Sequence, residues 1–201
     1  MSFSSFGFSK PITQAICASG YESPTEIQRQ AIPLILEGSD IIGCAPTGTG
    51  KTAAFVLPIL QNLSQKKANL LKMRRRAPRC LVLSPTRELA EQIDVSVQTY
   101  GKRTKLVSIA LYGGAPIKKQ LRALERGTDF VVATPGRLLD HIQRRSIDLR
   151  HIEVLVLDEA DRMFDMGFIK DVRKIIAAVP TNRQTLLFSA TMPKEIRKFA
   201  R

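Results

Sequence analysis

Three acidic residues stand together directly after an apolar run in the second half of the chain. The run 154–157 is VLVL, and Asp158, Glu159 and Asp161 follow it within four positions. Carboxylates at the end of a buried strand either form an ordinary polar turn or face a positively charged partner such as a metal ion. The other motifs of the sequence decide between these two interpretations.

A second peptide, APTGTGKT at 45–52, has the spacing of a phosphate-binding loop, with alanine in place of the usual first glycine. Gly48 and Gly50 allow backbone amides to turn inward, and the helix that follows adds its positive end. Lys51 can reach the β- and γ-phosphates, and the Thr52 hydroxyl can bind magnesium. The alternative is a glycine-rich turn without a ligand. The residues expected to bind a nucleotide are Ala45, Pro46, Thr47, Gly48, Thr49, Gly50, Lys51 and Thr52.

A magnesium ion held between Thr52 and the phosphates would explain the acidic cluster. Asp158, at the end of its strand, fits the aspartate that holds magnesium in phosphate-loop enzymes. Glu159 lies one residue further, where a carboxylate can orient and deprotonate the attacking water. We therefore expect Lys51, Asp158 and Glu159 to be catalytic, and Thr52 and Asp158 to be the metal ligands.

These peptides need elements that bring them to one place. Short β-branched runs alternate with amphipathic stretches, which is typical of a mainly parallel sheet with helices on both faces. The expected strands are 40–44, 80–84, 107–111, 130–133, 154–157 and 185–188, and the expected helices are 52–63, 87–100, 117–124, 136–142 and 168–179. Ligands of such sheets bind beyond the carboxyl ends of the strands, where these peptides would meet.

Composition limits the class of protein. With 201 residues and 44% hydrophobic content, the chain can bury one substantial core, so a single domain is expected. The net charge of +13 favours a polyanionic partner, either nucleic acid or an acidic membrane surface. No apolar run is long enough to span a membrane, and MSFSSFGFSK lacks a signal-peptide core.

Two further features concern the compartment and the surface. Cys17, Cys44 and Cys80 are scattered, without C-x-x-C spacing, and we interpret them as small buried hydrophobic residues in a reducing, cytoplasmic compartment rather than as metal ligands. The segment SQKKANLLKMRRRAPR at 64–79 is rich in charge. We interpret it as a solvated connection, and a dedicated RNA clamp is the alternative.

Six motifs, in the order APTGTGKT, PTRELAEQI, GG, TPGR, DEAD and SAT, resemble those of the DEAD-box RNA helicases. The resemblance extends from Phe3 to Thr191, and the short arm and spacing are most similar to bacterial members of the RhlE type. Ala45 fits this family, which usually carries alanine there. The resemblance implies a three-layer α/β RecA-like P-loop domain over residues 1–201. The family's second RecA-like domain, with its arginine fingers, has no counterpart in this chain.

The peptide GYESPTEIQ at 20–28 is similar to the family's adenine-reading Q motif, which would lie within 3–28. By this resemblance Gln28 would contact adenine N6 and N7, Tyr21 would pack against the base, and Phe3 would brace the motif. The cofactors would then be ATP or ADP with Mg²⁺. Without the resemblance, Gln28 is an ordinary helix residue and Phe3 a core anchor.

The resemblance also implies contacts with the RNA backbone, which position a strand without reading its bases. Arg87 and Arg137 could instead pair with Glu88 or Asp140. Asp161, Ser189 and Thr191 would couple the nucleotide to the RNA, and Ser189 and Thr191 could also form a strand-to-helix cap ahead of Pro193. The expected RNA-binding residues are Pro85, Thr86, Arg87, Gly113, Gly114, Thr134, Pro135, Gly136 and Arg137.

The expected function is the N-terminal, ATP-binding half of an ATP-dependent RNA helicase. The full enzyme would couple ATP hydrolysis to local unwinding of RNA, with RNA and the second RecA-like domain as partners and no membrane. The fragment itself would be a monomer and nearly inactive. The alternatives are a phosphate-loop kinase or simple ATPase, for which no lid or acceptor site accompanies the loop, and a nucleotide-gated platform for RNA or protein.

Overall fold

A computed structural model of the chain describes residues 2–65 and 77–191. Its centre is a six-stranded sheet in which every pair of neighbouring strands is parallel. In spatial order the strands are β1 (Ile41–Cys44), β6 (Gln184–Ser189), β5 (Val154–Leu157), β2 (Cys80–Leu83), β4 (Phe130–Ala133) and β3 (Ser108–Leu111).

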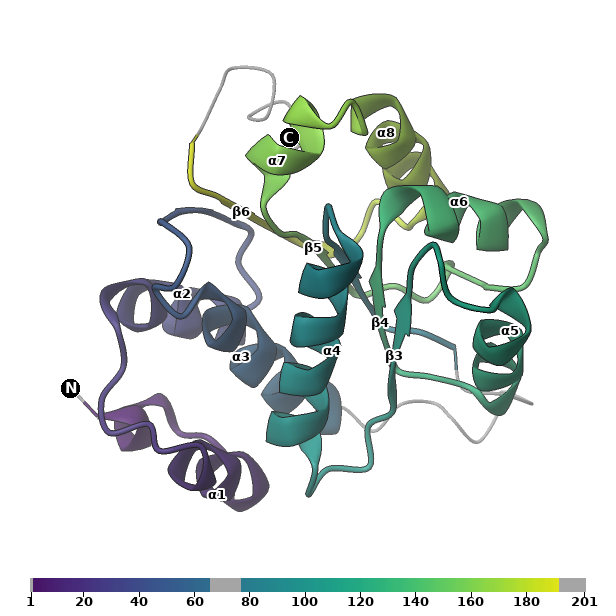
Figure 1. The fold of residues 1–201 in the computed structure, drawn as a ribbon. Helices are drawn as coiled ribbons and strands as arrows, with labels where there is room; N and C mark the ends of the chain where they lie inside the picture. The colour runs from purple at the N-terminus through teal and green to yellow at the C-terminus, as the bar shows by residue number, and fades with distance from the viewer. Residues whose placement is uncertain (1, 66–76, 192–201) are drawn as a thin grey trace.

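Helices cover both faces of this sheet, so the domain has three layers (Figure 1). Helices α1 to α4 pack on one face, and α5 to α8 pack on the other. The helical elements are η1 (Phe3–Phe6), α1 (Lys10–Ala18), α2 (Glu26–Leu36), α3 (Lys51–Gln65), α4 (Arg87–Gly101), α5 (Ile117–Arg126), α6 (Pro135–Gln143), α7 (Ala160–Asp165) and α8 (Ile169–Ala178).

The central strands are apolar throughout because both of their faces are buried. Cys80 and Val82 of β2 belong to the core under α1 to α4, whereas Leu81 and Leu83 belong to the core under α5 to α8. Each of these four residues is 0% exposed. The alternation of side chains along a strand therefore divides the hydrophobic interior into two cores, one on each side of the sheet.

The predicted three-layer α/β fold is confirmed. Every expected strand lies within one residue of an observed strand, and every expected helix within two residues. Helices α1, α2 and α7 were not among the expected elements. In the part of the chain that the structure describes, no helix has the length and apolar character needed to cross a membrane.

Two predictions about individual side chains were wrong. Cys80 is buried, but Cys17 and Cys44 are exposed, since Cys17 lies on the outer side of α1 and Cys44 on the edge strand β1. The basic connection 64–79 lies largely outside the described residues. Its last residue, Arg79, is not solvated: it is 7% exposed and donates to the Leu63 carbonyl at 2.9 Å.

Candidate functional site

The strand register places the carboxyl ends of the strands along one edge of the sheet. Leu83 pairs with both Ala133 and Leu157, and Cys44 pairs with Ser189. The peptides that begin at 84, 134 and 158 therefore start side by side, and the peptide that begins at 45 starts beside the end of β6, the strand next to β5. This edge is called the carboxyl rim below.

The phosphate-loop peptide forms a tight loop between β1 and α3. Gly48 and Gly50 have φ angles of +80° and +89°, which glycine adopts without strain. Lys51 is the first residue of α3, is 7% exposed, and donates from Nζ to the Ala45 carbonyl at 2.9 Å. Thr49 closes the loop by donating to the Pro46 carbonyl at 2.8 Å. Because α3 begins here, the positive end of a 15-residue helix points at the loop.

Gln28 ties the N-terminal segment to this loop. Its Oε1 accepts from the Thr25 amide at 3.0 Å within a helix capping box, and its Nε2 donates to the Gly50 carbonyl at 3.1 Å. The side chain is 2% exposed. A Cβ at position 50 would lie 2.5 Å from Gln28 Nε2, so the contact also needs glycine there. The structure thus brings the predicted adenine reader against the phosphate loop, with its amide engaged by the protein.

The two predicted aromatic residues lie together. The rings of Phe3 and Tyr21 stack with centroids 5.9 Å apart and an interplanar angle of 18°. Phe3 is buried and Tyr21 is 37% exposed. The Tyr21 hydroxyl is 2.6 Å from the hydroxyl of Tyr100, a residue of α4 that sequence reasoning missed. Burial and this hydrogen bond raise the pKa of Tyr100.

Asp158 directly follows β5 and is 5% exposed. Burial raises the pKa of its carboxyl to about 6, although the charge of Lys51 acts in the opposite direction. Among the described residues, its Oδ1 has no hydrogen-bond partner. A buried acceptor without a donor, close enough to an ammonium group to feel its charge, is the kind of atom that a divalent cation would satisfy.

Glu159 has φ 49° and ψ 51°, a left-handed conformation that is uncommon for a residue with a side chain. The chain changes direction here between β5 and α7, and Glu159 is the N-cap residue of α7. Its carboxylate lies 3.3 Å from the Arg162 guanidinium, and the side chain is 11% exposed. Sequence reasoning missed Arg162, which follows the acidic cluster by one residue.

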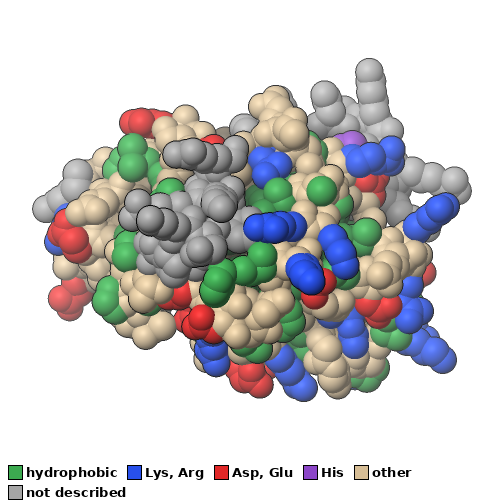
Figure 2. Space-filling model, turned by 90° about the horizontal axis from the view of Figure 1, so that it is seen from above, with side chains coloured by type: hydrophobic (Ala, Val, Ile, Leu, Met, Phe, Trp, Pro, Cys, Tyr) green, Lys and Arg blue, Asp and Glu red, His purple; other side chains and the backbone are tan. Residues whose placement is uncertain are grey.

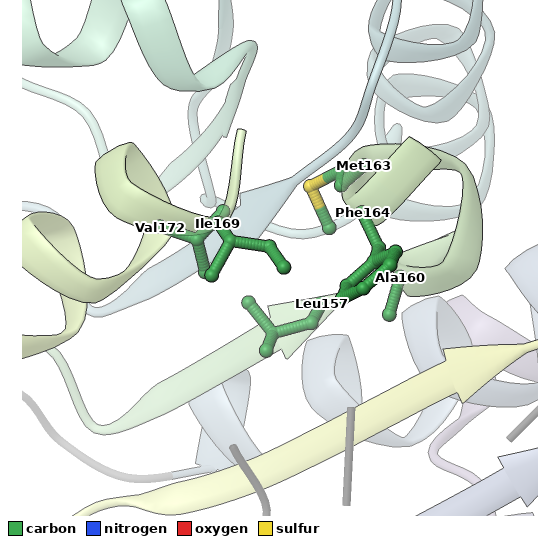
Figure 3. A pocket seen from close by; sticks show the side chains of 6 residues that line it. All are labelled: Leu157, Ala160, Met163, Phe164, Ile169 and Val172. Carbon is green, nitrogen blue, oxygen red and sulfur yellow. The ribbon is translucent and has the colours of Figure 1, made fainter. Parts of the chain in front are cut away.

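An apolar base supports the acidic segment from the side of α8. Figure 3 shows a small apolar cavity between the end of β5, α7 and α8, and its lining residues are Leu157, Ala160, Met163, Phe164, Ile169 and Val172. Leu157 and Ala160 flank Asp158 and Glu159 in the chain, and both are buried. The backbone on either side of the two carboxylates is therefore anchored in the apolar core.

The three predicted coupling residues do meet. Asp161 Oδ2 accepts from the Thr191 amide at 2.8 Å and from the Thr191 hydroxyl at 3.0 Å, and the Asp161 amide donates to Ser189 Oγ at 3.1 Å. Burial alone would raise the pKa of Asp161, but the bonds from Thr191 and Ser189 lower it. The end of β6 is thereby fastened to the first turn of α7.

The predicted RNA-type residues occupy the other half of the carboxyl rim, after β2, β3 and β4. Thr86 caps α4 by accepting from the Leu89 amide at 3.4 Å. Arg87 is half exposed, lies 4.9 Å from the centre of the Tyr112 ring, and pairs with Glu91 at 3.3 Å. The suggested pairing of Arg87 with Glu88 is therefore replaced by a pairing one turn along α4.

Arg137 is more constrained. Its side chain is 15% exposed, and its Nη1 donates to the Ala115 carbonyl at 3.1 Å and to Gln120 Oε1 at 3.2 Å. The carboxylate of Asp140 is 4.0 Å away, the limit of an ion pair. Gly113 and Gly114 are exposed in the loop beside it, and Pro135 and Gly136 begin α6. Gln120, which braces Arg137, was missed, although its spacing places it on the buried face of α5.

Basic side chains gather on part of this edge. Figure 2 views the molecule from the carboxyl rim, and Lys and Arg side chains gather on the side of α5 and α6. The exposed basic residues nearest this edge lie in the first half of α5 and are Lys118, Lys119 and Arg122. The RNA-type half of the rim therefore carries exposed positive charge.

Comparisons with known proteins agree with this geometry. A family model described as DEAD/DEAH box helicase matches residues 25–199. The chain is 50% identical to the ATP-dependent RNA helicase DeaD of Escherichia coli over 200 residues, which are 99% of this chain and 30% of that protein. It is 48% identical to the ATP-dependent RNA helicase CshA of Limosilactobacillus reuteri over 198 residues, which are 98% of this chain and 38% of the relative.

Solved structures give the same result. A DEAD box protein from the hyperthermophile Methanococcus jannaschii superposes with a TM-score of 0.90 at 41% identity, covering 100% of this chain and 53% of that protein. The chain spans about a third of the length of the curated relatives it matches, between 30% and 38%. The similarity therefore concerns only one part of each of these longer relatives.

Proposed function

The chain belongs to the DEAD/DEAH box helicase family, and we propose that it is the N-terminal, ATP-binding half of an ATP-dependent RNA helicase. The observation that carries this proposal is the meeting of two features on one rim. One is a phosphate loop with its lysine, and the other is a buried carboxylate, Asp158, that lacks a donor among the described residues. The basic half of the same rim supports RNA as the second ligand.

For the nucleotide, the loop 45–52 would hold the phosphates through its amides, and Lys51 would turn from the Ala45 carbonyl toward the β- and γ-phosphates. Tyr21 would pack against adenine, with Phe3 behind it. Gln28 would read adenine N6 and N7, which requires its amide to exchange at least one of its present bonds to Thr25 and Gly50.

For magnesium, the residues present fit the ion. Thr52 supplies a hydroxyl at the start of α3, and Asp158 supplies the buried carboxylate oxygen without a donor. When bound, the ion would neutralise charge on the β- and γ-phosphates. Glu159 would then accept a proton from the attacking water, since its turn holds a carboxylate next to Asp158 and 3.3 Å from the Arg162 guanidinium.

For RNA, the backbone phosphates would lie along Thr86, Arg87, the glycine pair at 113–114 and the start of α6. Amides, hydroxyls and guanidinium groups of this kind recognise phosphate and sugar rather than base edges, so we infer no sequence preference. Asp161 would carry the signal between the two ligands, because it fastens the end of β6 to the segment that holds Asp158 and Glu159.

A second RecA-like domain would complete the enzyme. Within residues 2–65 and 77–191 we assign no cation that faces the γ-phosphate from the side opposite Lys51. In phosphoryl transfer an arginine finger in that place contributes roughly 10³-fold or more to the rate. The chain alone should therefore bind ATP and RNA but hydrolyse ATP barely, and unwinding would belong to the longer protein.

A single-turnover hydrolysis assay tests this function against the alternatives. With this chain in excess over labelled ATP, we expect very slow release of phosphate that single-stranded RNA does not accelerate. Fast hydrolysis without RNA would favour a self-contained ATPase. Fast, RNA-stimulated hydrolysis by this chain would contradict the need for a second domain.

A further inference from the structure

Gln120, a buried residue of α5, joins three parts of the RNA-type half of the rim. Its Oε1 accepts from Arg137 Nη1 at 3.2 Å and lies 3.0 Å from His141 Nε2. Its Nε2 donates to the Tyr112 carbonyl at 3.0 Å, just before the glycine pair. The side chain is 5% exposed. One amide therefore connects the 112–115 loop, the start of α6 and the far turn of α6.

His141 completes this arrangement from beneath. It is 0% exposed, and its Nδ1 lies 2.8 Å from Ser146 Oγ. Because Gln120 uses its amide nitrogen on the Tyr112 carbonyl, its oxygen faces His141, and the imidazole must carry a hydrogen on Nε2. Burial, with the positive charge of Arg137, lowers the pKa of His141. The Ser146 hydroxyl beside Nδ1 also donates to the His141 carbonyl at 3.0 Å.

Arg137 is less buried than Gln120 and His141, with a side chain that is 15% exposed. Its Nη1 is shared between the Ala115 carbonyl and Gln120 Oε1, so the guanidinium is held by the loop on one side and by α5 on the other. A long, flexible side chain loses rotamer freedom when it binds a phosphate. An arginine that the protein already holds in place pays less of that cost at the moment of binding.

We propose that Gln120 and His141 are positioning residues for RNA: they hold the Arg137 guanidinium in the arrangement that binds backbone phosphate. This role rests on the proposed RNA function. Neither residue touches RNA in this arrangement, because both are buried beneath Arg137 and the loop. A purely structural role would predict a loss of stability without any specific loss of RNA contact.

Anisotropy titrations of labelled oligouridine, at a series of salt concentrations, separate these two roles. We expect Gln120→Leu to weaken RNA binding on the order of fivefold and Arg137→Ala to weaken it at least as much. The double variant should bind no more weakly than Arg137→Ala, since Gln120 acts through Arg137.

The salt slope should fall by about 1 in all three variants, because one phosphate contact is lost. Affinity for ADP should not change, because these residues lie on the other half of the rim.

A matched pair at position 141 provides a test that does not depend on Gln120→Leu folding. His141→Gln keeps an amide donor where Nε2 lies and should retain RNA affinity, whereas His141→Leu has no donor and should lose it. Ile35→Val, a buried change in α2, serves as the control for lost packing and should leave RNA binding unchanged.

The outcomes distinguish the two levels of the proposal. If Arg137→Ala weakens binding but Gln120→Leu and His141→Leu do not, or if the losses of the double variant add, the positioning role is wrong and the proposed function stands. If Arg137→Ala binds RNA with the affinity and salt slope of the parent, the phosphate role of this residue is wrong, and the positioning role with it.

Discussion

At the scale of single residues, the surroundings of Asp158 disfavour the charged form of its carboxyl group. Burial raises its pKa from 3.8 to about 6, and its Oδ1 has no donor in the described part of the chain. The pKa of Asp158 is higher in the folded chain than in the unfolded chain, so the folded chain binds this proton more tightly. The resulting stabilisation of the fold is fully present below pH 3.8 and is lost as the pH rises through about 6. At neutral pH the free chain therefore carries a buried carboxylate charge that destabilises the fold and that a bound cation would stabilise.

Asp158→Asn should therefore stabilise the chain when nucleotide and magnesium are absent. A shift of this size corresponds to at most ~3 kcal/mol, and we expect a gain of about 1–3 kcal/mol in the free energy of unfolding at pH 7. The gain should shrink as the pH falls from 6 to 4. Urea unfolding over this pH range measures it, with Asp165→Asn, an exposed change at the end of α7, as the control. Equal stability of parent and Asp158→Asn at pH 7 would contradict the account.

Gln28→Ala tests the adenine site. The parent should bind ADP more tightly than GDP, because guanine presents O6 where adenine presents an amino group. We expect the variant to lose about 1–3 kcal/mol of ADP affinity and most of this preference. Calorimetry with both nucleotides measures this, and Gln30→Ala, two residues along α2 and exposed, is the matched control. Equal affinities of the parent for ADP and GDP would remove the adenine-reading role.

The sequence indicated Asp158 as a candidate from its own pattern and Gln28 only through the family resemblance, and it did not indicate the hydrogen-bond partners of either residue. The spacing of Gly48, Gly50 and Lys51 predicts a phosphate loop wherever it occurs. That Gln28 donates to Gly50, 22 positions away, depends on how α2 packs against α3. Arg87 pairs with Glu91 instead of Glu88 because residues four apart face each other on a helix.

At the scale of elements, α7 and the end of β6 act as one unit through Asp161. Asp161→Ala removes two bonds from Thr191 and one from the Arg162 amide. We expect a loss of about 1–2 kcal/mol in the free energy of unfolding and faster amide exchange at 160–165 and 189–191. Hydrogen exchange measures both, with Asp165→Ala on the same helix as the control. If the two variants exchange alike, Asp161 does not fasten these elements.

The strands were predictable because apolar, β-branched runs of four to six residues leave few alternatives. Helix α7 was not, because it has six residues and starts from a left-handed glutamate, for which the sequence gives no signal. Helix α2 contains Pro33, which normally argues against a helix interior. Arg79 was assigned to solvent because its neighbours are basic, whereas its place at the start of β2 buries it against Asp129 and Glu153.

At the scale of the whole molecule, the strand order decides which motifs meet. The order β1-β6-β5-β2-β4-β3 sets the phosphate loop beside the end of β6 and one strand from Asp158, and it places the RNA-type peptides beyond them. Alternation of strands and helices predicts a parallel sheet, but long-range pairing determines the order of its strands. The family resemblance implied a RecA-like domain with a mainly parallel sheet, and the order of the strands comes from the structure.

The central claim, that the carboxyl rim is a nucleotide site, is tested most directly by titrating ADP into this chain with Mg²⁺ in a calorimeter. We predict saturable binding by the parent, weakened at least about tenfold by Lys51→Ala, because that change removes the ammonium charge that the loop supplies. Lys102→Ala, an exposed change at the end of α4, should bind as the parent does. Absence of ADP binding by the folded parent, or equal binding by Lys51→Ala, would contradict the account.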